Sequence, residues 1–152
     1  MGSTNDVVNE NKKIDKIITI LYKFNNSLFK YYMILLSKTM VDFLKGAAKH
    51  TYPNEFIGLL REKNGVISEI LIIPNSQVGK GFAFLRDIMI PIVSDSIGSV
   101  HSHPSRNNKP SKQDLIFFQR KGKIHIIICT PYEDRDIAVY DKNGTQLDFK
   151  IM

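Results

Sequence analysis

Apolar residues in the first third of the chain change from a strand pattern to a helical one. Residues 31–36 are mostly apolar and predict a strand. Ser37 is placed to cap a helix that runs to about His50, and the apolar residues of this helix recur on one face: Met40, Val41, Leu44 and Ala48. A strand followed directly by an amphipathic helix is typical of a domain that contains both kinds of element.

The clearest local prediction is a β-hairpin. Two apolar runs, 55–63 and 66–73, flank Asn64-Gly65, a dipeptide that suits the type I′ turn between antiparallel strands. Residues 82–93 alternate or continue as apolar positions and predict a further strand. The segment 78–93 precedes the most polar part of the chain, and we expect it to help line a substrate groove.

The second half of the chain repeats the alternation of strand and helix. Residues 98–103 predict a strand, Ser111 is placed to cap a short helix that stops near Gly122, and 124–129 is an apolar strand. Two closing strands, 137–140 and 147–152, are expected around Asn143-Gly144. This order predicts an α/β domain with a mixed curved β-sheet flanked by helices.

The first 33 residues differ from the rest and are expected to form a separate extension, with the domain at 34–152. Residues 1–11 are polar and predict disorder, and a helical stripe follows: Ile14, Ile17, Ile18, Leu21 and Tyr22. This stripe could pack on the domain, which we favour, form a dimer contact or lie on a membrane surface. Interspersed lysines make it too short to be a transmembrane segment, and it lacks a secretory cleavage site. A cytoplasmic location is therefore expected, and the oligomeric state is not indicated.

Composition narrows the class of protein. A chain of 152 residues with 43% hydrophobic and 24% charged residues is typical of one soluble domain. The single cysteine, Cys129, excludes an intrachain disulfide and a zinc cluster of cysteines.

The net charge is +6, and six basic residues against Asp114 alone lie between Arg106 and Lys123. This segment could attract an acidic protein or nucleic acid, or could simply be solvated, but it lacks the interleaved exposed aromatic residues of single-strand binders.

The most informative residues are His101 and His103, which share one face of a strand because side chains two apart point the same way. Pro104 ends that strand, and Asp114 lies in the first turn of the next helix, where the dipole favours an ionised carboxylate. Two imidazoles and one carboxylate form the ligand set of a zinc site that keeps one position open for water.

Each part of this pattern has a purely structural interpretation. Ser111-x-x-Asp114 is also a capping box, and a His-x-His pair alone is often surface or core polarity. Glu55, at the start of an apolar run, could be a solvated strand end or a general base. The combination at this spacing favours a metal site. The other histidines, His50 and His125, are interpreted as structural.

Glu55, His101-x-His103-Pro104 and Ser111-x-x-Asp114 together resemble the signature of the JAMM (MPN-plus) zinc metalloproteases. The resemblance extends to the segments 52–60, 98–101 and 125–129, which look like the short prokaryotic members, and covers roughly 34–152. It implies the JAMM/MPN fold, which is cytidine-deaminase-like, with one Zn²⁺ per chain bound by His101, His103, Asp114 and a water. By the same resemblance Glu55 acts as general base and Ser111 stabilises the oxyanion.

The resemblance also implies an activity. Family members hydrolyse isopeptide or peptide bonds after the C-terminus of ubiquitin-like proteins, and the prokaryotic ones resemble enzymes that act on small modifiers or sulfur-carrier proteins. The expected partner is therefore a protein of that kind, and nucleic acid is not expected. Two alternatives stay open: a non-catalytic adaptor of the MPN type, and a RadC-like protein associated with DNA.

Overall fold

The computed structural model describes residues 33–72 and 95–152, and residues 34–152 form one compact unit. The predictions for the N-terminal stripe, for the strand near 82–93 and for the groove segment 78–93 lie outside the described residues. In the described part of the chain, no helix is long and apolar enough to cross a membrane.

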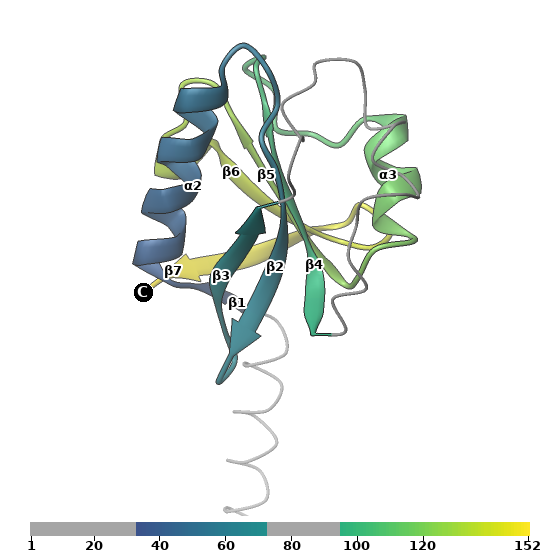
Figure 1. Ribbon diagram of the computed structural model, residues 1–152. Coiled ribbons are helices and arrows are strands. Elements are labelled where there is room, and N and C mark those ends of the chain that lie inside the picture. The colour runs from purple at the N-terminus through teal and green to yellow at the C-terminus, as the bar shows by residue number, and fades with distance from the viewer. Residues whose placement is uncertain (1–32, 73–94) are drawn as a thin grey trace, which may run out of the picture. The chain divides into compact units, whose positions relative to one another are not determined.

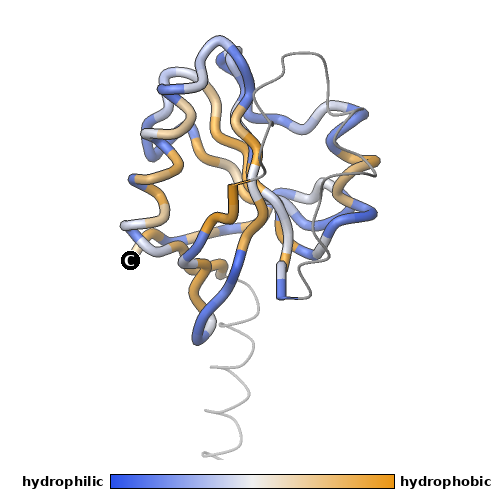
Figure 2. Tube along the Cα trace, viewed as in Figure 1, coloured by the Kyte–Doolittle hydropathy of each residue, from blue (hydrophilic) through white to orange (hydrophobic). Residues whose placement is uncertain are grey.

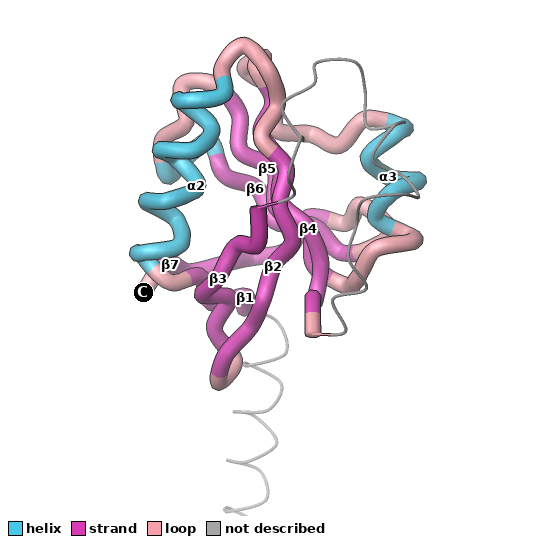
Figure 3. Tube along the Cα trace, viewed as in Figure 1, coloured by secondary structure: helices cyan, strands magenta, loops and turns pink. Residues whose placement is uncertain are grey.

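The described chain combines strands with two helices, in the units β1-α2-β2 and β4-α3-β5, which confirms the predicted α/β class (Figures 1 and 3). The elements follow in this order: β1 (Met33–Leu36), α2 (Lys38–Thr51), β2 (Ile57–Lys63), β3 (Val66–Ile72), β4 (Ser96–His103), α3 (Lys112–Phe118), β5 (Ile124–Cys129), a single 3₁₀ turn (Asp134–Asp136), β6 (Ile137–Asp141) and β7 (Gln146–Ile151).

The seven described strands form one mixed sheet in the order β1-β3-β2-β4-β5-β6-β7. The pairs β1–β3 and β4–β5 are parallel, and the other neighbours are antiparallel. The sheet closes into a barrel, and near the closure the N–H of Met152 donates to the carbonyl oxygen of Leu36 at 2.9 Å. The sequence predicted the curvature, whereas the closure depends on contacts between the two ends of the domain.

Helix α2 lies against one face of the sheet and α3 against the other (Figure 1), and the strands between them are largely hydrophobic (orange in Figure 2). Two clusters of buried apolar side chains fill these faces. Consecutive residues of β5 show the alternation, since Ile126 and Ile128 pack with α2 while Ile127 packs with α3. The central strands β4 and β5 are therefore covered on both sides. Polar groups between β4 and α3 are removed from water, which strengthens their electrostatic interactions.

Local signals placed most element ends correctly. The Ser37 hydroxyl accepts the N–H of Met40 at the start of α2, and Asn64 (φ 55°) and Gly65 (φ 80°) form the left-handed turn that a type I′ hairpin requires. The predicted end of the second helix was late, because α3 ends at Phe118. Tighter turns with i→i+3 hydrogen bonds follow it and lead to Gly122, whose φ is +104°.

Candidate metal centre

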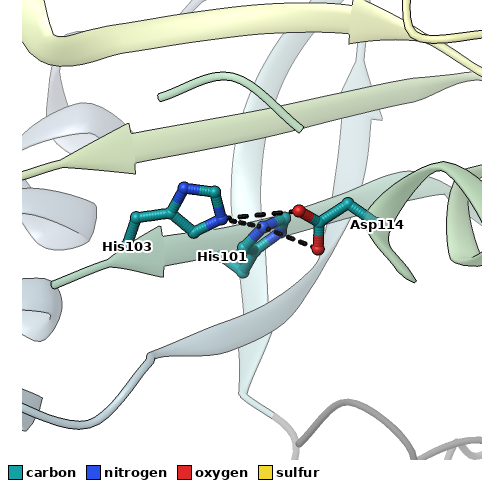
Figure 4. A group of neighbouring side chains, drawn as sticks. All are labelled: His101, His103 and Asp114. Atoms are coloured by element: carbon teal, nitrogen blue, oxygen red, sulfur yellow. Dashed lines mark hydrogen bonds and ion pairs between the residues drawn. The ribbon is translucent and has the colours of Figure 1, made fainter. Parts of the chain in front are cut away.

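Strand β4 directs the side chains of His101 and His103 to the same point (Figure 4). Their Nε2 atoms lie 3.0 Å apart, and His101 is fully buried while His103 is partly exposed. One ring thus lies deep beneath α3 and the other lies nearer the surface. A group bound between them would lie at the boundary between the core and the surface.

The third side chain comes from α3. Asp114 is 3% exposed, and its Oδ1 lies 3.3 Å from Nε2 of His101 while its Oδ2 lies 3.5 Å from Nε2 of His103. A capping box orients this carboxylate: the N–H of Ser111 donates to Oδ2 at 2.6 Å, and the Ser111 hydroxyl accepts the N–H of Asp114 at 3.2 Å. The capping and metal-site interpretations of this motif are therefore compatible, since the cap orients the carboxylate toward the imidazoles.

The spacing of these atoms fits a tetrahedral metal ion. Ligand atoms at about 2.0–2.1 Å from a tetrahedral zinc ion are about 3.3 Å from one another, as elementary geometry requires. The observed separations of 3.0, 3.3 and 3.5 Å lie around that value, and one ligand atom from each residue lies within 4.8 Å of the other two. Two nitrogens and one oxygen match the preference of zinc, so the structure brings together the three expected ligands.

The carboxyl group of the cluster is held in the ionised form that a cation needs. Burial opposes ionisation of Asp114, but hydrogen bonds from His101 and His103 and the electrostatic interaction with His101 hold the pKa of this carboxyl well below its usual range. Burial also lowers the pKa of His103, but hydrogen bonds to Asp114 and to the Asn107 carbonyl outweigh it, so that this pKa is raised. A divalent cation bound here would compete with protons for the two imidazole nitrogens, so its affinity should rise with pH.

The orientation of the His103 ring is fixed from its far side. Its Nδ1 lies 2.7 Å from the carbonyl oxygen of Asn107, a contact in which Nδ1–H must donate because the carbonyl has no hydrogen. In the neutral ring this leaves the lone pair on Nε2, the atom that faces His101 and Asp114. Sequence analysis missed Asn107, because every residue has a backbone carbonyl and no residue type indicates this role.

The two proposed catalytic residues lie outside the ligand group. Glu55 is half-buried, two residues before β2, and its negative charge contributes to the raised pKa of His103. Ser111 is exposed at the N-terminus of α3, one turn before Asp114. Both therefore lie near the cluster without being part of it.

The remaining histidines and the cysteine do not join the described ligand group. The ring of His125 stacks on Phe118 with centroids 4.0 Å apart, its Nδ1 lies 2.8 Å from the Ser99 hydroxyl oxygen, and burial lowers its pKa to about 4. His50 is exposed in the last turn of α2. Cys129 is buried beside His103 in the β4–β5 register, and burial raises the pKa of its thiol.

Known proteins are similar to this chain in sequence and in fold. The family described as prokaryotic homologs of the JAB domain matches residues 37–140. A probable metalloprotease from Haloferax volcanii is 34% identical over 122 residues, which cover 74% of this chain and 75% of the relative.

Two solved structures are similar over nearly their whole length. One, described as JAMM, a metalloprotease-like zinc site in the proteasome and signalosome, has a TM-score of 0.64 and 30% identity over 79% of this chain and 98% of its own. The other, a JAB1/MPN domain protein from Archaeoglobus fulgidus, has a TM-score of 0.64 and 32% identity over 78% of this chain and 99% of its own. These matches confirm the family resemblance that the metal-site motif indicated.

Proposed function

This chain belongs to the prokaryotic homologs of the JAB domain, and from that membership we propose that it is a zinc-dependent protease for ubiquitin-like or sulfur-carrier proteins. It would hydrolyse the isopeptide or peptide bond that follows the C-terminus of such a protein. The observation that carries this proposal is the convergence of His101, His103 and Asp114 on one point beside a half-buried carboxylate.

The three converging side chains would hold one zinc ion per chain. When bound, zinc acts as a Lewis acid and lowers the pKa of a coordinated water to about 7. Glu55 would remove a proton from the attacking water and deliver it to the departing amine nitrogen, so that the enzyme ends each cycle in its starting state. The Ser111 hydroxyl would donate a hydrogen bond to the developing oxyanion. No covalent intermediate with the protein is needed.

A basic surface around α3 supports an acidic protein as substrate. It consists of Arg106, Lys109, Lys112, Arg120, Lys121 and Lys123, all of which are exposed except the half-buried Lys121. No ion pair joins these six to acidic side chains within the described residues. By contrast, Lys45 and Lys49 of α2 are paired with Glu133, and Lys45 also pairs with Asp134. Uncompensated positive charge beside a reaction centre raises the rate of encounter with a negatively charged partner.

The test is direct cleavage. Zinc-loaded protein is incubated with fusions that join candidate ubiquitin-like and sulfur-carrier proteins through their C-terminus to a reporter domain, with and without a chelator. Mass spectrometry then identifies the cut site. We expect cleavage directly after the modifier, loss of cleavage with the chelator and recovery when zinc is restored.

The variant Glu55→Gln separates catalysis from binding. It should retain zinc and the fold while losing at least about 100-fold in kcat, because general base catalysis typically contributes 10²–10⁴-fold. Zinc-loaded protein that binds the modifiers but cuts none of them would support the adaptor alternative instead. Tight DNA binding that weakens steeply with salt would support the RadC-like alternative. The cytoplasmic location expected from the sequence stays a prediction.

A further inference from the structure

The loop that carries the Asn107 carbonyl, residues 104–110, is tied by hydrogen bonds to the ends of β5 and β6. At its beginning, the Thr130 hydroxyl donates to the carbonyl oxygen of Pro104 at 2.7 Å, and the Thr130 N–H donates to that of Ser105 at 3.0 Å. These bonds fix the first two residues of the loop to the end of β5. They do not reach the middle of the loop, where Asn107 lies.

The middle of the loop is held by Tyr140 of β6. The Tyr140 hydroxyl donates to the carbonyl oxygen of Asn108 at 3.0 Å, and the Asn108 side-chain amide donates to the carbonyl oxygen of Asp136 at 3.2 Å. Asn108 follows Asn107 directly, so two consecutive carbonyls accept hydrogen bonds from different parts of the protein. One accepts from the sheet, and the other accepts the Nδ1–H of His103.

The Tyr140 side chain is itself rigidly placed. It is 4% exposed, and its ring lies 6.4 Å from that of Phe118, which is also within 6.3 Å of the His101 ring. Strand β5 separates β6, which carries Tyr140, from the ligand strand β4. The hydrogen bond described for the Tyr140 hydroxyl goes to the loop and not to a ligand side chain. The ring contact with Phe118 would remain in Tyr140→Phe, so the influence of the hydroxyl itself on the metal centre passes through the loop.

We infer that Tyr140 is a positioning residue of the metal centre, which holds residues 104–110 so that the Asn107 carbonyl keeps His103 in the tautomer that binds a cation. The hydrogen bond between His103 and Asn107 lies at the exposed side of the site, where water competes for both groups. A loop released from Tyr140 would present the carbonyl only part of the time. This inference rests on the proposed metal site but not on catalysis, so it can be tested separately from the proposed protease activity.

The experiment compares two buried tyrosines in the full chain. Tyr140→Phe removes the hydroxyl that holds the loop, and Tyr132→Phe is the matched control, since Tyr132 is 3% exposed and no hydrogen bond joins its hydroxyl to residues 104–110. The dissociation constant for zinc is measured by competition with a chromogenic chelator. We expect Tyr140→Phe to bind zinc about tenfold more weakly, the lower range for loss of a group that orients a metal ligand, and Tyr132→Phe to bind it as the wild type does.

Nitrogen NMR of the His103 ring in zinc-free protein supplies the second measurement. The wild type should show a protonated Nδ1 and an unprotonated Nε2 in the neutral ring, and Tyr140→Phe should show a mixture of both tautomers. If Tyr140→Phe does not fold, Asn108→Ala tests the same loop by removing its bond to Asp136. Unchanged zinc affinity in a folded variant, or an equal loss in both tyrosine variants, would overturn the inference.

Discussion

The Ser102 hydroxyl accepts the backbone N–H of Phe56 at 2.7 Å, and the Ser102 N–H donates to the Phe56 carbonyl oxygen at 2.9 Å. The ladder between β2 and β4 pairs Ile57 with His101, so this double contact is the last connection between the strands before Glu55. Both residues are buried. Ser102 also alternates with the two histidines and therefore points away from the face that they share. It links the proposed base to the ligand strand without contacting the ligand atoms.

Ser102→Ala should reduce turnover while leaving the metal site intact. It leaves the buried Phe56 N–H without its acceptor, which should lower the free energy of unfolding by about 1–3 kcal/mol. Because Glu55 is the next residue, we expect kcat to fall about 10- to 100-fold with little change in KM, the cost of a base displaced by about 1 Å. Steady-state kinetics, zinc analysis and urea denaturation measure the three quantities.

Ser96→Ala is the control for this substitution, because its hydroxyl bonds to the Gly98 carbonyl on the same strand and has no connection to Phe56. It should retain the kcat of the wild type. If Ser102→Ala loses zinc as well as turnover, the effect runs through the ligands and our explanation is wrong.

Two substitutions at Ser111 separate its capping task from its proposed catalytic one. Alanine at an N-cap position costs about 1 kcal/mol, whereas glycine costs only a few tenths. Both lack the hydroxyl. If that hydroxyl stabilises the oxyanion, Ser111→Ala and Ser111→Gly should lose a similar factor in kcat, of about 100-fold, despite their different stabilities. A loss of activity that instead follows the loss of stability would leave capping as its only task.

Residues close in sequence explain why the ligand group could be predicted. His101 and His103 share a face because of the two-residue period of a strand, and Asp114 follows from the capping pattern that begins at Ser111. The residues that support the group are distant in sequence. The Ser102 hydroxyl contacts a residue 46 positions away, and Tyr140 contacts one 32 positions away. Such contacts depend on strand order and on the closure of the sheet, which no local pattern specifies.

The buried His125 should make the stability of the metal-free protein depend on pH. Burial lowers its pKa to about 4 from 6.5 in an unfolded chain, so the unfolded state binds a proton first as the pH falls. The stability that the neutral ring provides is complete above pH 6.5 and is lost progressively as the pH falls to about 4. The difference between the two pKa values corresponds to about 3 kcal/mol at most.

Urea denaturation of wild type and His125→Gln between pH 4 and 7, with a chelator present, measures this effect. The variant lacks a titratable ring, so its stability should fall less than that of the wild type over this range, whatever its stability at pH 7. Both proteins share the metal ligands, so the difference between them reports the titration of His125 together with its charge interaction with His101. If stability falls equally with pH in the two proteins, His125 has the same pKa in the folded and the unfolded state, and the prediction is wrong.

The basic surface around α3 should govern the rate of substrate capture rather than the chemical step. We expect the double variant Arg106→Glu and Arg120→Glu to lose at least about tenfold in kcat/KM at low salt, where steering is strongest, and to keep the wild-type kcat. The difference should shrink as added salt screens the charges, because the screening length falls from about 30 Å at 0.01 M to about 8 Å at 0.15 M. Lys63→Glu, which reverses an exposed charge at the end of β2, is the control. If the double variant is equally impaired at all salt concentrations, or if its kcat falls, these residues act by contact or through the fold and not by electrostatic steering.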